Sequence, residues 1–410
     1  MNTKLSAGVA SLMATVTFGG MAAAQTADVL HYWTSGSESA AMGVFADAFK
    51  AKGGTWVDSA VGGFDTARAT ALNRVAGGNP PTVLLDNVGE VADFAKQGIL
   101  APIDPEIAKG VIANSPSVLL ERITYQGKLY AIPVDIGGSN WMWYSPKAFA
   151  DIGAAPPKDW DEFLAMADQL KAKGYVPLAF GGQPWQEASL FYNVLLAQGR
   201  ETYKQIMNGH DVAAAGGPAV VKTFEIMRKL TAYVDEGSQG REWNDATAMV
   251  MQNKAAIQIM GDWAKGEFLS AGLVPGKDFG CQLAPGTEGA YQMVVDLFDF
   301  PVVKSADNIA GQKLFQQVVA DPVVQANFSK LKGSLPARLD ADVSGSDMCM
   351  ELGQKTLRDP AAQVPNYEFV FTADQEGQLK DLVSEFWSSP DMSATDAAAQ
   401  FAQIVGQSAK

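Results

Sequence analysis

Short apolar segments alternate with amphipathic helical segments along this chain, and this order restricts the fold more than any other feature. Residues 29–33 are apolar enough for a strand, and Ser35 opens a segment whose apolar residues recur at helical spacing until Gly53. The two patterns recur at 82–98, 159–180 and 255–269. Because strands that alternate with helices form sheets with helices on their faces, the sequence predicts an α/β fold.

The first 24 residues are typical of a signal peptide. Lys4 precedes an apolar, small-residue stretch from Leu5 to Ala23, which ends in a small-residue cleavage pattern before Gln25. A buried N-terminal helix is the alternative, but the Gly and Thr content favours processing. No later stretch is apolar for the eighteen or so residues that a membrane span needs. We therefore expect a soluble, exported protein.

Even without that segment, the chain is too long for one ordinary core, and two lobes fit its length. No Pro/Gly/Ser-rich linker separates two halves, so the boundary is expected to be a compact crossover. The candidate crossovers contain Gly and Pro and lie at Pro133–Gly138 and Phe300–Lys304. If the chain crosses more than once, each lobe is discontinuous in sequence.

Charge and motifs exclude several classes of function. The 31 basic and 45 acidic residues argue against nucleic acid and anionic lipid as main partners, and leave a neutral ligand plausible. Neither of the two histidines, His31 and His210, lies in a zinc-binding motif. No GxSxG, Walker or GxGxxG motif is present. The sequence thus predicts no metal and no cofactor.

Cys281 and Cys349 are the only cysteines. An even count in an exported chain favours one disulfide, and two buried free thiols are the alternative. Closing a loop of about 70 residues would stabilise the fold by roughly 4 kcal/mol in the chain-entropy model.

Aromatic and polar residues stand together where the first predicted strand ends. Tyr32 and Trp33 close that strand, and Glu38 lies in the first turn of the next helix, where the helix dipole favours a carboxylate. Ligands of open α/β sheets bind outside the carboxyl ends of strands. A sugar needs this mixture, because its apolar face stacks on a ring while its hydroxyls need polar partners. Alternatively, Ser35 and Glu38 form only a capping box.

Other segments offer the same chemistry. Trp263 follows the strand predicted at 255–260, and two facing aromatic rings would sandwich a sugar ring. Asp296 lies among apolar residues, where a carboxylate is costly unless it accepts hydrogen bonds. Many tryptophans are simply core residues, and a lone lysine is usually solvated. The further candidates are Asn87, Trp185, Trp243, Trp263, Asp296, Lys332 and Arg338.

Four ordered segments carry a family resemblance: HYWTSG at 31–36, NWMWY at 140–144, MGDWAKG at 260–266 and KGSLPAR at 332–338. Over nearly the whole mature chain, they are similar to the extracellular sugar-binding proteins of ABC transporters. The resemblance is to the glucose/mannose-binding type of the maltose-binding-protein-like superfamily. It implies a monomeric, periplasmic receptor that closes over a carbohydrate without a chemical step and is presented to the permease subunits.

The resemblance also implies a two-lobed periplasmic-binding-protein fold, in which each lobe is a mixed sheet flanked by helices and a hinge joins the two. The expected N-terminal lobe comprises residues 25–135 and about 296–342. The expected C-terminal lobe comprises about 136–295 and 343–410.

Carried over position by position, the resemblance assigns roles to individual residues. Tyr32 and Trp33 match paired aromatics, and Glu38 matches a hydroxyl-binding carboxylate. Trp243 and Trp263 match aromatics of the second lobe, Asp296 and Lys332 match a polar pair, and the two cysteines fall where such proteins carry a bridge.

The chain departs from the glucose-binding pattern at a few positions. Leu85 and Asn87 stand where glucose binders place Gln and His or another polar residue, and a histidine expected near 366–368 is missing. Hydroxyl-reading sites discriminate strongly through such groups, so these changes argue against glucose itself.

The sequence therefore predicts a binding protein that captures a mono- or short oligosaccharide by hinge closure. An exported glycoside hydrolase is one alternative, since paired carboxylates with aromatic platforms also serve glycosidic cleavage. A two-lobed binder of an organic acid, polyamine or ferric ion is another, but such ligands would recruit a more charged site than Tyr32 and Trp33 offer.

Overall fold

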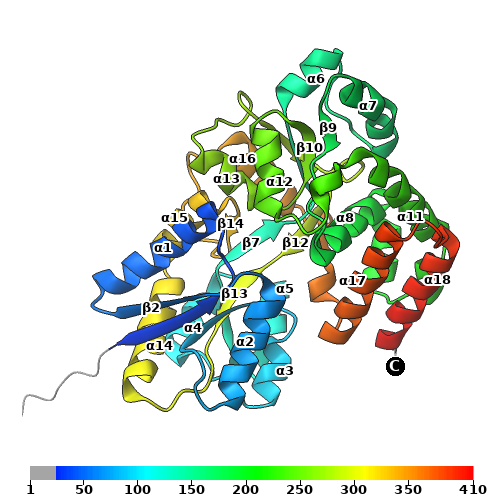
Figure 1. Cartoon of the computed structure of the whole chain (residues 1–410). Coiled ribbons are helices and arrows are strands. Elements are labelled where there is room, and N and C mark those ends of the chain that lie inside the picture. The colour runs from blue at the N-terminus through cyan, green and yellow to red at the C-terminus, as the bar shows by residue number, and fades with distance from the viewer. Residues whose placement is uncertain (1–24, 410) are drawn as a thin grey trace, which may run out of the picture.

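A five-stranded sheet forms the centre of the first lobe in the computed structural model, which describes residues 25–409 (Figure 1). The predicted signal peptide, residues 1–24, lies outside the described residues. The strand order is β2-β1-β3-β13-β6. β1 pairs in parallel with β2 and β3, whereas β13 is antiparallel to β3 and β6. The strands are β1 (Thr26–His31), β2 (Thr55–Ala60), β3 (Val83–Asn87), β6 (Ala131–Pro133) and β13 (Asp296–Asp299).

Helices pack around this sheet. The helix predicted after Ser35 is α1, and its capping box between Ser35 and Glu38 is present. The chain leaves it through Gly53, whose φ of 90° suits glycine. On the same side lie α14 and α15, which pack against α1. The elements of this lobe are α1 (Gly36–Ala51), α2 (Phe64–Ala76), α3 (Val91–Lys96), α4 (Pro105–Ala113), α5 (Ser117–Ile123), α14 (Ala306–Val319), α15 (Pro322–Lys332) and the β4–β5 hairpin (Thr124–Tyr125, Lys128–Leu129).

The second lobe has its own four-stranded sheet in the order β11-β8-β10-β9. Its strands are β8 (Trp141–Tyr144), β9 (Val176–Leu178), β10 (Ala255–Ile259) and β11 (Gly280–Leu283). The strands of the patterns at 159–180 and 255–269 are thus β9 and β10, and they are parallel neighbours. The chain builds two separate lobe sheets, but the expectation that each half of the chain builds its own was wrong, because β13, near residue 296, joins the first sheet between β3 and β6.

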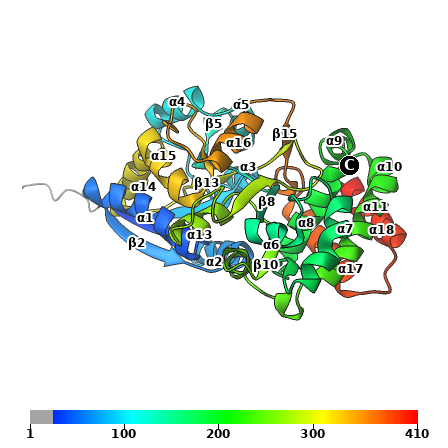
Figure 2. The same ribbon diagram turned by 90° about the horizontal axis from the view of Figure 1, so that it is seen from above.

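Helices make up most of the second lobe. Seen from above, α8, α11, α17 and α18 form a layer at the end of the molecule opposite α1 and α14 (Figure 2). The helices outside the first group are α6 (Pro146–Ile152), α7 (Trp160–Ala172), α8 (Pro184–Ala197), α9 (Arg200–Met207), α10 (Val212–Ala215), α11 (Pro218–Leu230), η1 (Thr231–Tyr233), η2 (Glu236–Ser238), α12 (Trp243–Met251), α13 (Ala264–Ser270), α16 (Met348–Leu357), η3 (Tyr367–Phe369), α17 (Ala373–Ser388), α18 (Ala394–Val405) and η4 (Gly406–Ala409). No helix within 25–409 is both long and apolar enough to cross a membrane.

A third sheet, β14-β7-β12-β15, lies between the two lobe sheets. Its strands are β7 (Asp135–Gly138), β12 (Tyr291–Val294), β14 (Leu335–Pro336) and β15 (Gln363–Pro365). The chain enters it directly from β6 and leaves it directly into β13. The candidate crossover at Pro133–Gly138 therefore lies in this connecting sheet.

The other candidate crossover, Phe300–Lys304, was wrong. It joins β13 to α14, and α14 packs on β1 of the same sheet. Phe300 has no exposed surface and belongs to the core. The chain passes between the sheets earlier, at Val294–Asp296, because Gly and Pro mark loops of every kind and do not distinguish a crossover from a loop inside one lobe.

The predicted disulfide between Cys281 and Cys349 is present, with a Cα–Cα distance of 5.9 Å. It joins β11 to α16, the first helix after the chain has left β14. The alternative of two buried free thiols is excluded. The bond ties the last part of the chain to the sheet of the second lobe.

Candidate ligand-binding site

The ends of β1 and β3 and the start of β13 bring three candidate residues together. Tyr32 follows β1, and its hydroxyl donates a hydrogen bond of 2.8 Å to Oδ1 of Asp296. Asp296 begins β13, where it lies opposite Asn87, the last residue of β3. Because β1 and β3 are parallel neighbours, their carboxyl ends meet at the edge of the sheet where α/β folds place ligands.

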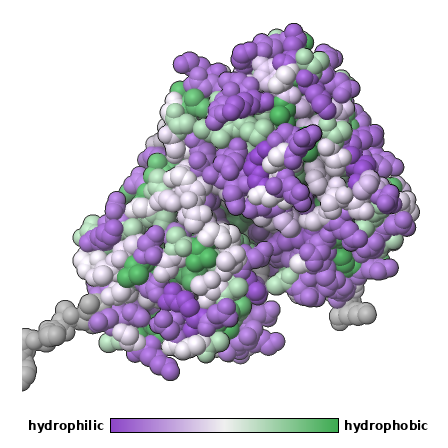
Figure 3. Space-filling view, viewed as in Figure 1, coloured by the Kyte–Doolittle hydropathy of each residue, from purple (hydrophilic) through white to green (hydrophobic). Residues whose placement is uncertain are grey.

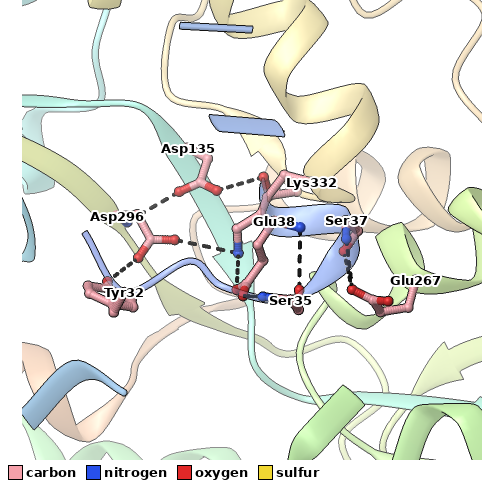
Figure 4. A network of polar contacts seen from close by, with 9 residues as sticks. Tyr32, Ser35, Ser37, Glu38, Asp135, Glu267, Asp296 and Lys332 are labelled. Carbon is pink, nitrogen blue, oxygen red and sulfur yellow. Dashed lines mark hydrogen bonds and ion pairs between the residues drawn. The ribbon is translucent and has the colours of Figure 1, made fainter. Parts of the chain in front are cut away.

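Lys332, the last residue of α15, lies at the centre of this group (Figure 4). Only 3% of its side chain is exposed. Its Nζ lies 3.5 Å from Oε1 of Glu38 and 4.0 Å from Oδ2 of Asp296. Both distances exceed the roughly 2.7–2.9 Å of a charge-assisted hydrogen bond. The ammonium group therefore retains donors for the oxygen atoms of a ligand.

Two tryptophans flank the same ammonium group. Nζ of Lys332 lies 5.0 Å from the ring centroid of Trp33 and 5.5 Å from that of Trp263, within the range of cation–π attraction. Trp33 is 1% exposed and stacks on Phe328 in the core of the first lobe. Trp263, which caps α13, is only partly buried. Trp33 thus supports the lysine from the core, whereas Trp263 reaches it from the second lobe.

Two buried carboxylates, Asp135 and Asp262, lie near Lys332 beside the third sheet, and sequence reasoning missed both. Asp135 accepts hydrogen bonds from the backbone amide of Asp296, at 3.2 Å, and from the hydroxyl of Ser334, at 2.7 Å. Asp262 accepts one of 2.9 Å from the backbone amide of Gly138. The only sequence signal was their position at a crossover and at a strand–helix turn. They connect the strands of the third sheet to the polar group, which comprises Tyr32, Glu38, Asp296 and Lys332.

The electrostatics of the group favour a charged lysine. Burial by itself lowers the pKa of Lys332, but the surrounding carboxylates together raise it above its usual value. Burial raises the pKa of Asp135 well above its usual range, and the neighbouring Asp296 raises it further. Burial also raises the pKa of Asp262 to about 7. The carboxylates that act on Lys332 are Glu38, Asp296, Asp135 and Asp262.

A second cluster of acidic side chains lies on η3 and α17. Nζ of Lys380 lies 3.9 Å from both Oε2 of Glu376 and Oδ1 of Asp65, and the latter belongs to α2 of the first lobe. Burial raises the pKa of Glu368 to about 7, which Lys380 opposes and Asp296 reinforces. The surface formed by η3 and α17 therefore faces the end of the first sheet. On the face seen in Figure 3, the surface is hollowed where the two lobes meet.

The positions that depart from the glucose-binding pattern have distinct surroundings. Leu85 is 2% exposed and lies in the core of the first lobe. Asn87 is 6% exposed, and its Oδ1 accepts a hydrogen bond of 2.9 Å from the amide of Gly89. Where a histidine was expected, near 366–368, the chain presents Glu368, which sequence reasoning did not select.

The remaining candidates lie apart from the polar group or within a core. Trp243 begins α12 and is 8% exposed. Trp185 lies partly buried in α8 and donates a hydrogen bond of 2.9 Å to Gln183. Arg338 makes two hydrogen bonds of 2.8 Å to Asp340, and no hydrogen bond or ion pair within 25–409 joins it to the Lys332 group. In the same range no cluster of three or more His, Cys, Asp or Glu could hold a metal ion.

Residues 33–326 match the model of the bacterial extracellular solute-binding protein family. The chain belongs to this family. One relative of this solute-binding protein is a "probable sugar-binding periplasmic protein" of Rhizobium meliloti strain 1021, which is 41% identical over 352 residues. The match covers 85% of this chain and 84% of the relative.

Solved structures confirm the predicted two-lobed fold of this solute-binding protein. A chitin oligosaccharide binding protein superposes with a TM-score of 0.77 at 19% identity, over 94% of this chain and 99% of the other. The maltose-maltodextrin binding protein of Alicyclobacillus acidocaldarius does so with a TM-score of 0.67 at 17% identity, over 93% and 100% of the two chains. At these identities the likeness establishes the fold.

Proposed function

We propose that the protein is the substrate-binding component of a carbohydrate ABC importer, which captures a mono- or short oligosaccharide by hinge closure. The observation that carries the proposal is the position of Lys332, which lies among carboxylates of the first lobe and beside Trp263 of the second. The names of relatives as sugar-binding periplasmic proteins support it. No step in this function changes a covalent bond.

The polar group matches the surface of a sugar. Lys332 donates to ring or hydroxyl oxygens, while Glu38 and Asp296 accept from hydroxyls. Tyr32 holds Oδ1 of Asp296, so in this proposal Oδ2, which lies 4.0 Å from Nζ of Lys332, is the oxygen that accepts from the sugar. Trp263 offers an aromatic ring for the apolar face of the sugar. Arg338 has no role in this proposal because its guanidinium group is bound to Asp340.

The other tryptophan candidates keep secondary roles in the proposal. Trp185 and Trp243 lie on helices of the second lobe, where they would contact sugar units beyond the one bound at Lys332. Trp33 supports the site by stabilising the ammonium group of Lys332, because its own ring stacks on Phe328 in the core.

Closure in this proposal bends the sheet that joins the lobes. Its strands β7, β12 and β14 continue into both lobes, which supports boundaries near 135, 296 and 342. Asp135 and Asp262 lie in or beside these strands, so hinge movement and the Lys332 group are coupled. We further propose a periplasmic monomer, released by cleavage after residue 24 and presented closed to the permease in the inner membrane.

A thermal-shift screen of the mature protein tests the function. The compounds are monosaccharides, disaccharides, trisaccharides, organic acids and polyamines. A ligand at a hundred times its Kd stabilises the folded state by about 2.7 kcal/mol. We expect one sugar, or a few epimers, to raise the melting temperature. If only organic acids or polyamines raised it, the carbohydrate proposal would be wrong, and release of product from an aryl glycoside would overturn the non-enzymatic role.

A further inference from the structure

Glu267 of the second lobe is hydrogen-bonded to the first turn of α1 in the first lobe. Glu267 lies in α13, which follows β10 of the second sheet, whereas α1 follows β1 of the first. Its Oε1 accepts a hydrogen bond of 2.6 Å from the hydroxyl of Ser37 and one of 3.0 Å from the backbone amide of the same residue (Figure 4). Ser37 has no exposed surface, so this polar connection between the lobes is shielded from water.

The contact with Glu267 is the shortest polar contact at the start of α1. The two capping-box bonds between Ser35 and Glu38 measure 3.3 and 3.4 Å, beyond the roughly 3.2 Å limit of a good N–H···O bond. The hydroxyl bond to Glu267, by contrast, has the length of a charge-assisted bond. The amide of Ser37 is also one of the donors that a helix start leaves without an intrahelical partner, and the helix dipole favours a carboxylate there. Glu267 therefore fixes this turn more firmly than the capping box alone.

Glycine lets the start of α13 pack closely on the first lobe. A Cβ atom added to Gly266 would lie 2.7 Å from the carbonyl oxygen of Leu331 and 2.9 Å from that of Lys332. It would also lie 2.9 Å from Cβ of Ser37. Real Cβ atoms do not come closer than about 3.0 Å, so any side chain at this position would push α13 away. α13 thus contacts the two helices of the first lobe that end or begin at the site, α15 with Lys332 and α1 with Glu38.

We infer that Glu267 is a positioning residue, which holds the sugar-binding carboxylate of Glu38 in place relative to Trp263 of the second lobe. This inference rests on the proposed function. Ser37 and Glu38 are adjacent, so a bond that fixes Ser37 also fixes the backbone from which the carboxylate of Glu38 extends. Trp263 caps the helix that carries Glu267, so the same bond sets the separation of the ring and the carboxylate. Partners that are already fixed lose little freedom when the sugar binds, and affinity is higher for that reason.

The first measurement needs no sugar. Amide hydrogen exchange of the peptide that contains residues 36–39 is followed by mass spectrometry in the mature protein. We expect Glu267→Ala to speed this exchange about tenfold, because local opening of the first turn becomes easier. Glu351→Ala is the control, since it removes an exposed glutamate from the first turn of α16, and it should leave the exchange unchanged. Equal exchange in the wild type and in Glu267→Ala would overturn the inference.

The second measurement is the affinity for sugar. D-Glucose, D-galactose, D-mannose and maltose are titrated calorimetrically against the wild type, followed by the other sugars of the thermal-shift screen, and the tightest is kept. Glu267→Ala should weaken its binding about tenfold, because the carboxylate of Glu38 is no longer held in advance. Glu267→Gln keeps an oxygen that accepts both bonds from Ser37 and should stay within about threefold of the wild type. A glutamine variant as weak as the alanine variant would overturn the role of these hydrogen bonds.

A double-mutant cycle distinguishes positioning of Glu38 from a general loosening of the fold. If Glu267 acts through Glu38, the change Glu267→Ala should weaken binding by less than about threefold in a Glu38→Ala protein, where no carboxylate is left to position. A general loosening would give the same factor in both backgrounds, and that result would overturn the inference. The melting temperature of each variant without sugar shows that it folds.

The two proposals fail in different ways. If the wild type binds a sugar and Glu267→Ala binds it equally tightly, the role of Glu267 is overturned and the sugar-binding function stands. If no sugar of the screen binds the wild type, the proposed function is overturned, and the positioning of a sugar-binding carboxylate is overturned with it, whatever the exchange of α1 shows.

Discussion

Tyr32 donates its hydroxyl hydrogen to Asp296, although the two residues are 264 positions apart in the chain. The bond joins the end of β1 to the start of β13, the strand that returns from the connecting sheet. It therefore fixes the carboxylate of Asp296, which we propose as a ligand contact, at the point where the chain re-enters the first lobe.

Tyr32→Phe should weaken sugar binding about tenfold. The substitution removes the donor that holds Asp296, so that carboxylate becomes free to rotate or to pair with Lys332 instead. Stability should change by only about 1 kcal/mol, as for an ordinary hydrogen bond. Titration calorimetry measures the first effect and urea unfolding the second. Unchanged affinity would show that the position of Asp296 does not depend on this bond.

Lys332→Met should abolish sugar binding and destabilise the fold by about 3 kcal/mol, because it leaves buried carboxylates without their cation. Adding Glu38→Gln should recover part of the stability, since one of the unpaired charges is then removed. Lys330→Met, on the exposed side of the same helix, is the control and should change neither sugar binding nor stability. The assignment fails if Lys332→Met and Lys330→Met bind sugar equally well.

Loss of the disulfide should lower the free energy of unfolding by about 4 kcal/mol in the chain-entropy model, given the separation of 68 residues. The double variant Cys281→Ser/Cys349→Ser should show this loss in urea unfolding, while its affinity for sugar stays within about twofold of the parent. Reducing agent should destabilise the wild type in the same way but not the double variant. A wild type that is insensitive to reduction would contradict the stabilising role.

The stability of the unliganded protein should fall as pH rises from about 4 to about 7. Burial raises the pKa of Asp86 to about 7, and burial together with Asp86 raises the pKa of Asp299 well above its usual value. The folded state then holds protons that the unfolded chain has released, so each unit of pH costs stability within this window. Glu90 adds to the repulsion and Arg68 opposes it.

Asp299→Asn should flatten that pH dependence, because an amide in contact with Asp86 carries no charge and can donate to it. The exposed Asp391→Asn should leave the slope unchanged. Chemical unfolding at a series of pH values measures both. A slope of the same size in Asp299→Asn as in the wild type would show that this carboxyl pair is not its source.

The elements of the fold follow closely from local sequence. Ser35 and Glu38 start α1 because a capping box needs only residues one turn apart. The strands near 176 and 255 are equally local, because a buried strand needs only a short apolar run. The two cysteines could also be paired from sequence, since with two there is one connectivity.

The candidate site was only partly accessible to sequence reasoning. Tyr32, Asp296 and Lys332 could be selected, because aromatic or charged residues at strand and helix ends are conspicuous, and the family resemblance carried them further. Asp135 and Glu368 could not, because each looks like an ordinary polar residue of a loop. What distinguishes both is the proximity of Asp296, which lies 161 positions from Asp135 and acts on Glu368 from another element of the fold.

The sequence by itself thus determined the class of fold, the single disulfide and most of the polar groups at strand ends, since these depend on residues a few positions apart or on a simple count. Only the tertiary structure decided where the chain crosses between lobes, which strands form the connecting sheet, and which carboxylates surround Lys332. Those facts depend on pairing between distant segments, such as Asp296 with Asn87, and no local pattern of residues encodes such a pairing.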